Sequence, residues 1–229
     1  MSSTKVLLFC LILCLSASVV PFAQDDHLYQ VSTINALLIG LYDGEITMAE
    51  LKQKGDFGLG TVNGLDGELI VMDGTAYHVT YDGSVHEVPD DEKTPFAAVT
   101  FFEQDDVFSV PQGLTYPELK TFITERLPST NLFYAVKITG TFSSMKTRSV
   151  PKQTEKPYPK LVDVVQSQSE FEFTDTTGTI IGLYAPGYVT DINVPGYHFH
   201  YLTEDKNAGG HVLEFVAGDV TVELDTTFG

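Results

Sequence analysis

The sequence predicts an α/β fold of the α+β kind, rich in strands, in which two mixed or antiparallel β-sheet units pack together with a few helices. Residues that favour strands are abundant, among them 15 Phe and 11 Tyr. Short segments of alternating polarity are separated by Asp-Gly pairs, which are the strongest local signal for a β-hairpin. Helical spacing of apolar residues is confined to a few segments.

Composition limits the classes of function. The chain has 229 residues, of which 43% are hydrophobic, so it can bury the core of one large domain or two small ones. Its formal net charge is −18. Such a surface repels nucleic acids and anionic membranes, and it repels anionic substrates at long range. An anionic small-molecule substrate would therefore need a metal or an arginine at its site.

The N-terminus, residues 1–23, is predicted to be a secretory signal peptide. Met1–Lys5 carries a positive charge, Val6–Leu15 is a short apolar run, and cleavage would follow Ser18 or Ala23. The run is too short for a membrane span. The sequence thus predicts a secreted or periplasmic protein with no membrane partner after cleavage.

Both cysteines, Cys10 and Cys14, lie in this leader. The mature chain would then have no thiolate, and histidines and carboxylates would have to hold any metal.

The first elements are predicted from apolar patterns and capping residues. Thr33–Tyr42 is apolar enough for a helix or a buried strand, and Thr47–Lys54 is expected to form a short helix capped by Thr47. Strands are expected at Glu68–Met72, Thr75–Tyr81, Ser84–Val88 and Ala97–Phe102.

A second helix is expected at Tyr116–Arg126, where apolar residues follow helical spacing. The Pro-rich segment Pro151–Pro159 is the candidate linker between an N-terminal unit, 24–152, and a C-terminal unit, 153–229, of one integrated catalytic domain. A faint echo joins L-I-G-L-Y at Leu38–Tyr42 to I-I-G-L-Y at Ile180–Tyr184, hinting at two similar sheets. The remaining expected strands are Phe133–Gly140, Thr141–Val150, Phe171–Thr174, Thr179–Tyr184, Tyr197–Leu202, His211–Ala217 and Val220–Leu224.

Three of the six histidines lie in one short segment, Tyr197–His211. On a strand, His198 and His200 point to the same side. A polar loop with two glycines would return the chain so that His211 joins them. Three imidazoles on a hairpin leave a metal open to substrate, as in catalytic sites, and they suit Zn²⁺ as well as Fe²⁺, Co²⁺, Ni²⁺ or Cu²⁺.

Two charged residues stand in unusual places. Glu68 leads directly into an apolar strand, where a carboxylate needs a partner such as a metal, although a solvent-facing position is the alternative. Arg148 shares a strand face with Lys146 and could bind a carboxylate with two hydrogen bonds, the alternative being a surface ion pair.

At these residues the chain resembles the α-acetolactate decarboxylase family. The matching stretches are Gly58–Ile70, Phe133–Gln153 and Pro195–Phe215, within a resemblance that runs from about Val31 to the end. The last stretch, with H-F-H, E-D and A-G-G-H-V, is much more specific than a loose metal-binding pattern. The resemblance implies two mixed α/β units, dominated by β-sheet, with the metal at their interface.

The resemblance also implies roles for individual residues. Zinc ligands fall on His198, His200 and His211, the active-site glutamate on Glu68 and the active-site arginine on Arg148.

The implied reaction is that of a carboxy-lyase of acetoin biosynthesis and the butanediol pathway, which converts 2-acetolactate to acetoin and CO₂. Thr61 matches a threonine that lines the substrate site. A metal-stabilised enediolate would form on loss of CO₂, and Glu68 or Arg148 would donate the proton. No organic cofactor is expected. The oligomeric state stays open, with a homodimer as one alternative.

Family members typically continue past the position of Gly229 and carry a second glutamate to the metal. Neither Glu223 nor Asp225 matches it by position, so a truncated, non-catalytic secreted metal-binding protein is one alternative.

Two other metalloenzyme classes stay open. A cupin-like enzyme would use H-x-H-x-x-x-E, which His198, His200 and Glu204 satisfy, although His211 follows too soon. A carbonic-anhydrase-like hydrase would use three histidines and no arginine beside them. Only the decarboxylase requires Glu68 and Arg148 close to the three imidazoles.

Overall fold

The computed structural model describes residues 27–228. The predicted signal peptide, 1–23, therefore lies outside the described residues. Among residues 27–228, no helix has the length and apolar character needed to cross a bilayer.

The first half of the chain folds into a six-stranded antiparallel sheet with the order β1-β8-β3-β4-β5-β6. Its centre is almost fully buried, and every residue of β3 is buried. A two-stranded ribbon, β2 with β7, lies beside it. These strands are β1 Tyr29–Val31, β2 Ile46–Thr47, β3 Phe57–Val62, β4 Asp66–Met72, β5 Thr75–Val79, β6 Val85–Glu87, β7 Lys93–Thr94 and β8 Phe96–Thr100.

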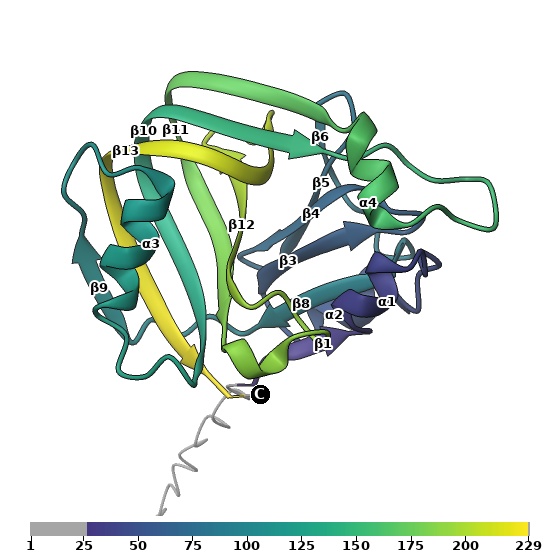
Figure 1. Cartoon of the computed structure of the whole chain (residues 1–229), viewed down its shortest axis with the longest axis horizontal. Helices are drawn as coiled ribbons and strands as arrows, with labels where there is room; N and C mark the ends of the chain where they lie inside the picture. The colour runs from purple at the N-terminus through teal and green to yellow at the C-terminus, as the bar shows by residue number, and fades with distance from the viewer. Residues whose placement is uncertain (1–26, 229) are drawn as a thin grey trace, which may run out of the picture.

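The second sheet closes on itself. Strand β10 pairs with β11 on one side and with β13 on the other, and β12 joins β11 to β13. Four long strands thus form a barrel, and β9 extends it at β13 (Figure 1). The strands are β9 Asp106–Ser109, β10 Phe133–Ser149, β11 Ser169–Ala185, β12 Gly196–Thr203 and β13 Gly209–Thr227.

Short helices cover the two sheets. Helix α2 has the expected cap, since Thr47 Oγ1 accepts from the backbone of Glu50 and Glu50 returns the bond. The apolar segment Thr33–Tyr42 gives one helix, α1, and then a turn. The helices are α1 Ile34–Leu38, α2 Met48–Lys52, α3 Tyr116–Thr124 and α4 Leu161–Val164, with 3₁₀ turns η1 Val165–Ser167 and η2 Gly187–Val189.

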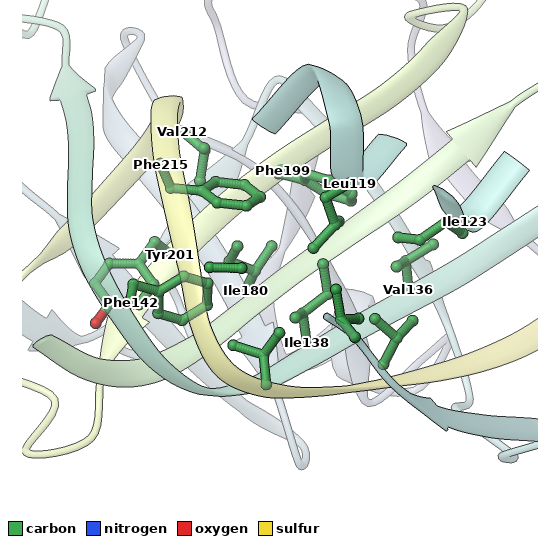
Figure 2. Packing of buried hydrophobic residues seen from close by; sticks show 14 of the residues in the cluster. Leu119, Ile123, Val136, Ile138, Phe142, Ile180, Phe199, Tyr201, Val212 and Phe215 are labelled. Carbon is green, nitrogen blue, oxygen red and sulfur yellow. The ribbon is translucent and has the colours of Figure 1, made fainter. Parts of the chain in front are cut away.

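The barrel core is aromatic and aliphatic. Phe142 packs edge-on against Tyr201 and Phe215, and α3 contributes Leu119 and Ile123 to the same cluster (Figure 2). Burying such side chains is worth roughly 1.5–3 kcal/mol each. The core thereby fixes the alternation of β12, whose odd-numbered residues face inward and whose histidines face outward.

A second apolar cluster joins the two sheets. Ile70 and Tyr77 of the first sheet pack with Ile181 and Leu183, which lie on the outer face of the barrel. The outward residues of β12 therefore face β4 across this interface.

Part-way along β10, the side chains that face the barrel core change from even-numbered to odd-numbered residues. Phe142 and Met145 both lie in the barrel core, while Ser143 and Ser144 between them are exposed. The register with β13 shifts at this point. The change turns Arg148 to the outer face, toward the first sheet.

The β-rich α+β class is confirmed, with differences in detail. The strands expected on either side of Gly140, Asp175 and Gly218 are continuous, because the barrel neighbours supply hydrogen bonds across each break. Strand β9 was not expected, since Asp106–Ser109 is short and exposed.

Two features of the sequence correspond neither to a structural repeat nor to a boundary between the sheets. Leu38–Tyr42 forms the end of α1 and a turn, whereas Ile180–Tyr184 lies in barrel strand β11. The two similar sequences therefore mark no structural repeat. The Pro-rich segment Pro151–Pro159 does not separate the two sheets, because β9 and β10 precede it and hydrogen-bond within the second sheet.

Gly182 is required for close contact between β11 and β12. A Cβ there would lie 2.0 Å from Phe199 Cδ1. We expect Gly182→Ala to lower the free energy of unfolding by about 2 kcal/mol, the range for overpacking. Urea unfolding would measure it. Gly187→Ala, whose Cβ meets nothing within 4 Å, is the matched control. Equal stability of the two variants would contradict the prediction.

Candidate metal centre

The three histidines of Tyr197–His211 come together on the outer face of the barrel. His198 and His200 share one side of β12, and His211 of β13 is the register partner of His200. The two glycines at the start of β13 have a steric reason. Gly210 has φ +132°, and a Cβ there would lie 2.6 Å from the carbonyl oxygen of Arg148. Glycine thus lets β13 approach β10 closely as it brings in His211.

One nitrogen from each imidazole lies within 4.8 Å of the others. His198 Nε2 and His211 Nδ1 are 3.2 Å apart. Nitrogens bound to one zinc ion at about 2.0–2.1 Å are separated by roughly 3.3 Å, so this pair already has suitable spacing.

His200 is fixed by the opposite sheet. Its Nδ1 lies 2.9 Å from the carbonyl oxygen of Leu69 on β4, so Nδ1 carries the proton and Nε2 carries a lone pair. Nε2 is buried and has no hydrogen-bond partner among the described residues. His200 Nε2 lies 3.4 Å from Glu68 Oε2, and these two atoms would repel each other if both carried only lone pairs. A metal ion on Nε2, or a proton on Glu68, relieves this contact.

Burial keeps the imidazoles neutral. It lowers the pKa of His198 to about 4, and the nearby Arg148 guanidinium adds to the effect. Burial also holds the pKa values of His200 and His211 well below the usual range. At neutral pH all three therefore offer lone pairs rather than protons.

Glu68 and Arg148 complete the cluster. Glu68 is 5% exposed on β4, and its Oε1 accepts a hydrogen bond from Arg148 Nη1 at 3.2 Å. Burial raises the pKa of Glu68 to about 6, while Arg148 partly opposes the shift. The structure thus brings all five predicted site residues together.

Thr61 lies beside them at the register shift between β3 and β4. Its hydroxyl donates to the carbonyl oxygen of Gly67 at 2.7 Å, directly before Glu68. The oxygen of that hydroxyl can still accept a bond from a ligand.

These groups line one wall of a cavity of about 450 Å³. The other walls are largely apolar and come from α1, the 190–195 loop and the start of α3. Sequence reasoning missed them, because neither Tyr116 nor Asn193 stands in a motif and only the tertiary fold places them at the cavity. They include Leu37, Leu65, Phe96, Tyr116, Val150 and Asn193.

Other candidate residues lie elsewhere. Lys146 pairs with Glu170 at 2.8 Å on the barrel surface. Glu204 is exposed and lines a separate depression with Asp205, so the cupin-like pattern with His198 and His200 is wrong. His78 faces His86 across β5 and β6, as ordinary strand residues do.

The donor set fits a divalent transition metal. The three imidazoles are neutral, their nitrogens converge, and His200 is oriented by a backbone carbonyl as metal-binding histidines usually are. Three nitrogen ligands leave a position open to substrate.

Known proteins share the sequence and the fold of this chain. The family model for alpha-acetolactate decarboxylase matches residues 28–228. The chain is 50% identical over 206 residues to an alpha-acetolactate decarboxylase of Methanosarcina mazei, covering 89% of this chain and 71% of that protein. It is 47% identical to that of Brevibacillus brevis, with coverage of 88% and 70%. The crystal structure of the Bacillus subtilis enzyme superposes with a TM-score of 0.86 at 42% identity, covering 88% of this chain and 86% of that one.

Removal of one imidazole should abolish tight metal binding. We expect the protein to bind one equivalent of Zn²⁺. Loss of a residue that only orients a metal ligand typically lowers metal affinity by roughly 10–100-fold, and we expect His211→Ala to lower it by more than that. Competition with a chelating dye would measure this affinity. His86→Ala, on the exposed strand β6, is the control. Unchanged affinity in His211→Ala would contradict the assignment.

The raised pKa of Glu68 makes stability depend on pH. Because this pKa lies near 6 in the folded protein, above the usual 4.5, the contribution of Glu68 is full below pH 4.5 and is lost as pH rises through 6. In metal-free protein, wild type should lose about 1 kcal/mol relative to Glu68→Gln between pH 5 and pH 7.5. Urea unfolding with a chelator present would measure the difference. Parallel pH profiles would rule it out.

Proposed function

The chain belongs to the alpha-acetolactate decarboxylase family, and we propose that it decarboxylates 2-acetolactate to acetoin and CO₂ with Zn²⁺ held by His198, His200 and His211. Members of this family are carboxy-lyases. A small-molecule substrate agrees with the cavity, and the net charge of −18 disfavours nucleic acid as a partner.

One observation carries the proposal. Three neutral imidazoles, a buried carboxyl and an arginine converge on a single cavity wall, although they come from β4, β10, β12 and β13. A carbonic-anhydrase-like hydrase would need only the imidazoles, whereas decarboxylation of an anion also uses the arginine and a proton source.

The protein residues prepare the metal position and then act on the substrate. When bound there, Zn²⁺ supplies Lewis-acid stabilisation of the negative charge that loss of CO₂ leaves on the former ketone oxygen. The imidazoles hold it without protonation at neutral pH, and the Leu69 carbonyl keeps His200 Nε2 directed at it.

Arg148 supplies the attraction for the substrate anion. Its side chain is 15% exposed, and its guanidinium is paired on one side with Glu68. The remaining donors can hold the substrate carboxylate. This positive charge offsets the repulsion of a strongly acidic protein at short range.

Glu68 is the better proton source for the enediolate. Burial raises the pKa of Glu68 to about 6 in the metal-free protein, so the carboxyl can carry a proton, whereas a guanidinium rarely gives one up. Because Glu68 is held on β4, it delivers the proton from one side of the cavity, as a chiral product requires. The walls away from the metal centre are largely apolar.

The experiment is acetoin production from racemic 2-acetolactate by purified, zinc-loaded protein. We expect wild type to form acetoin, and His198→Ala and Arg148→Gln each to lose at least about 100-fold in kcat/KM, as for loss of a group that stabilises developing charge. His86→Ala is the control. Stoichiometric zinc binding without acetoin would overturn the proposal and indicate a non-catalytic metal-binding protein.

A further inference from the structure

The barrel has a splayed edge next to the metal centre. Strands β12 and β13 pair only over His200–Leu202 with Gly209–His211, and then separate. Helix α3 and the residues directly before it fill the gap and are hydrogen-bonded to both strands. Ala217 N of β13 donates to the Leu114 carbonyl at 2.8 Å, and the Thr124 and Tyr197 hydroxyls lie 2.9 Å apart.

Tyr116, the first residue of α3, is held firmly in this gap. Its ring packs against Phe199 of β12 at 5.8 Å and against Phe215 of β13 at 5.2 Å between centroids. Lys120 Nζ lies 4.2 Å from the ring centroid. The ring therefore has little freedom to turn.

The hydroxyl of Tyr116 differs from those of the neighbouring tyrosines. Tyr197 bonds to Thr124 and Tyr201 bonds to Thr176, but the Tyr116 hydroxyl has no hydrogen-bond partner within residues 27–228. Tyr116 lines the same cavity as the three histidines. The side chain is half-buried, and its hydroxyl, with no protein partner among the described residues, is free to donate to a ligand in the cavity.

The chemical character of this group suits an anionic ligand. Burial raises the pKa of Tyr116 to about 12, so the phenol stays protonated and donates. It adds no charge that would compete with Arg148 or with a metal. Tyr116 belongs to α3 at the edge of the barrel, whereas Glu68 belongs to β4 of the first sheet.

Resting on the proposed function, we propose that Tyr116 contacts the substrate, its hydroxyl donating a hydrogen bond to an oxygen of 2-acetolactate. The substrate then lies between a neutral donor from the barrel and Glu68 from the opposite sheet. Tyr116 would thus help to fix which side of the substrate faces Glu68.

The test compares Tyr116→Phe with Tyr201→Phe in zinc-loaded protein. Phenylalanine keeps the ring contacts, and Tyr201 is a barrel-core tyrosine whose hydroxyl bonds to Thr176 and lies away from the cavity. We expect Tyr116→Phe to lose about tenfold in kcat/KM, the worth of a hydrogen bond to a charged group. Calorimetric binding of 2-hydroxy-2-methylpropanoate, which lacks the ketone, should weaken by about tenfold as well.

The outcomes separate this inference from the proposed function. If wild type forms acetoin and Tyr116→Phe matches it within twofold in both kcat/KM and analogue binding, Tyr116 has no contact with substrate. If wild type forms no acetoin, the proposed function fails first. Should Tyr116→Phe unfold, Tyr116→3-fluorotyrosine keeps the shape and makes the phenol more acidic. A changed kcat/KM in that variant supports the contact, and an unchanged one overturns it.

Discussion

The hydrogen bond from His200 Nδ1 to the Leu69 carbonyl is the interaction on which the site depends. It joins the barrel to the first sheet at the centre of their apolar interface. It also selects the tautomer of His200 and sets β4 in register with β12, so that Glu68 lies opposite the imidazoles. A shift of β4 by one residue would turn Glu68 away and leave a buried imidazole without its acceptor.

The sequence predicted much of this site because strand periodicity is a local rule. His198 and His200 had to share a face, and two glycines made a return to His211 plausible. The β-rich class likewise followed from Asp-Gly turns and strand-forming residues. Glu68 and Arg148 were ambiguous from spacing alone, and the family resemblance, more than periodicity, favoured them over the surface alternatives.

The features of the site that the sequence could not predict depend on contacts between segments that are far apart in the chain. At Ser143 and Ser144 the inward and outward faces of β10 exchange, which turns Arg148 outward. No sequence pattern near these residues predicts the exchange, because it arises where β10 pairs with β13. The continuity of the long strands through Gly140 also comes from their partners. Tyr116 stands in an ordinary helix start, and its place at the cavity follows from the separation of β12 and β13.

Strand β13 links the order of synthesis to the metal site. It pairs with β12, β10 and β9, and it carries His211 near its beginning. Strands β9, β10 and β12 all precede β13 in the chain. The barrel can therefore close only after β13 has been synthesised. His198 and His200 alone form an incomplete pair of ligands. Tight uptake of the proposed metal would therefore be a late event in the protein's biogenesis, because it requires the barrel to have closed.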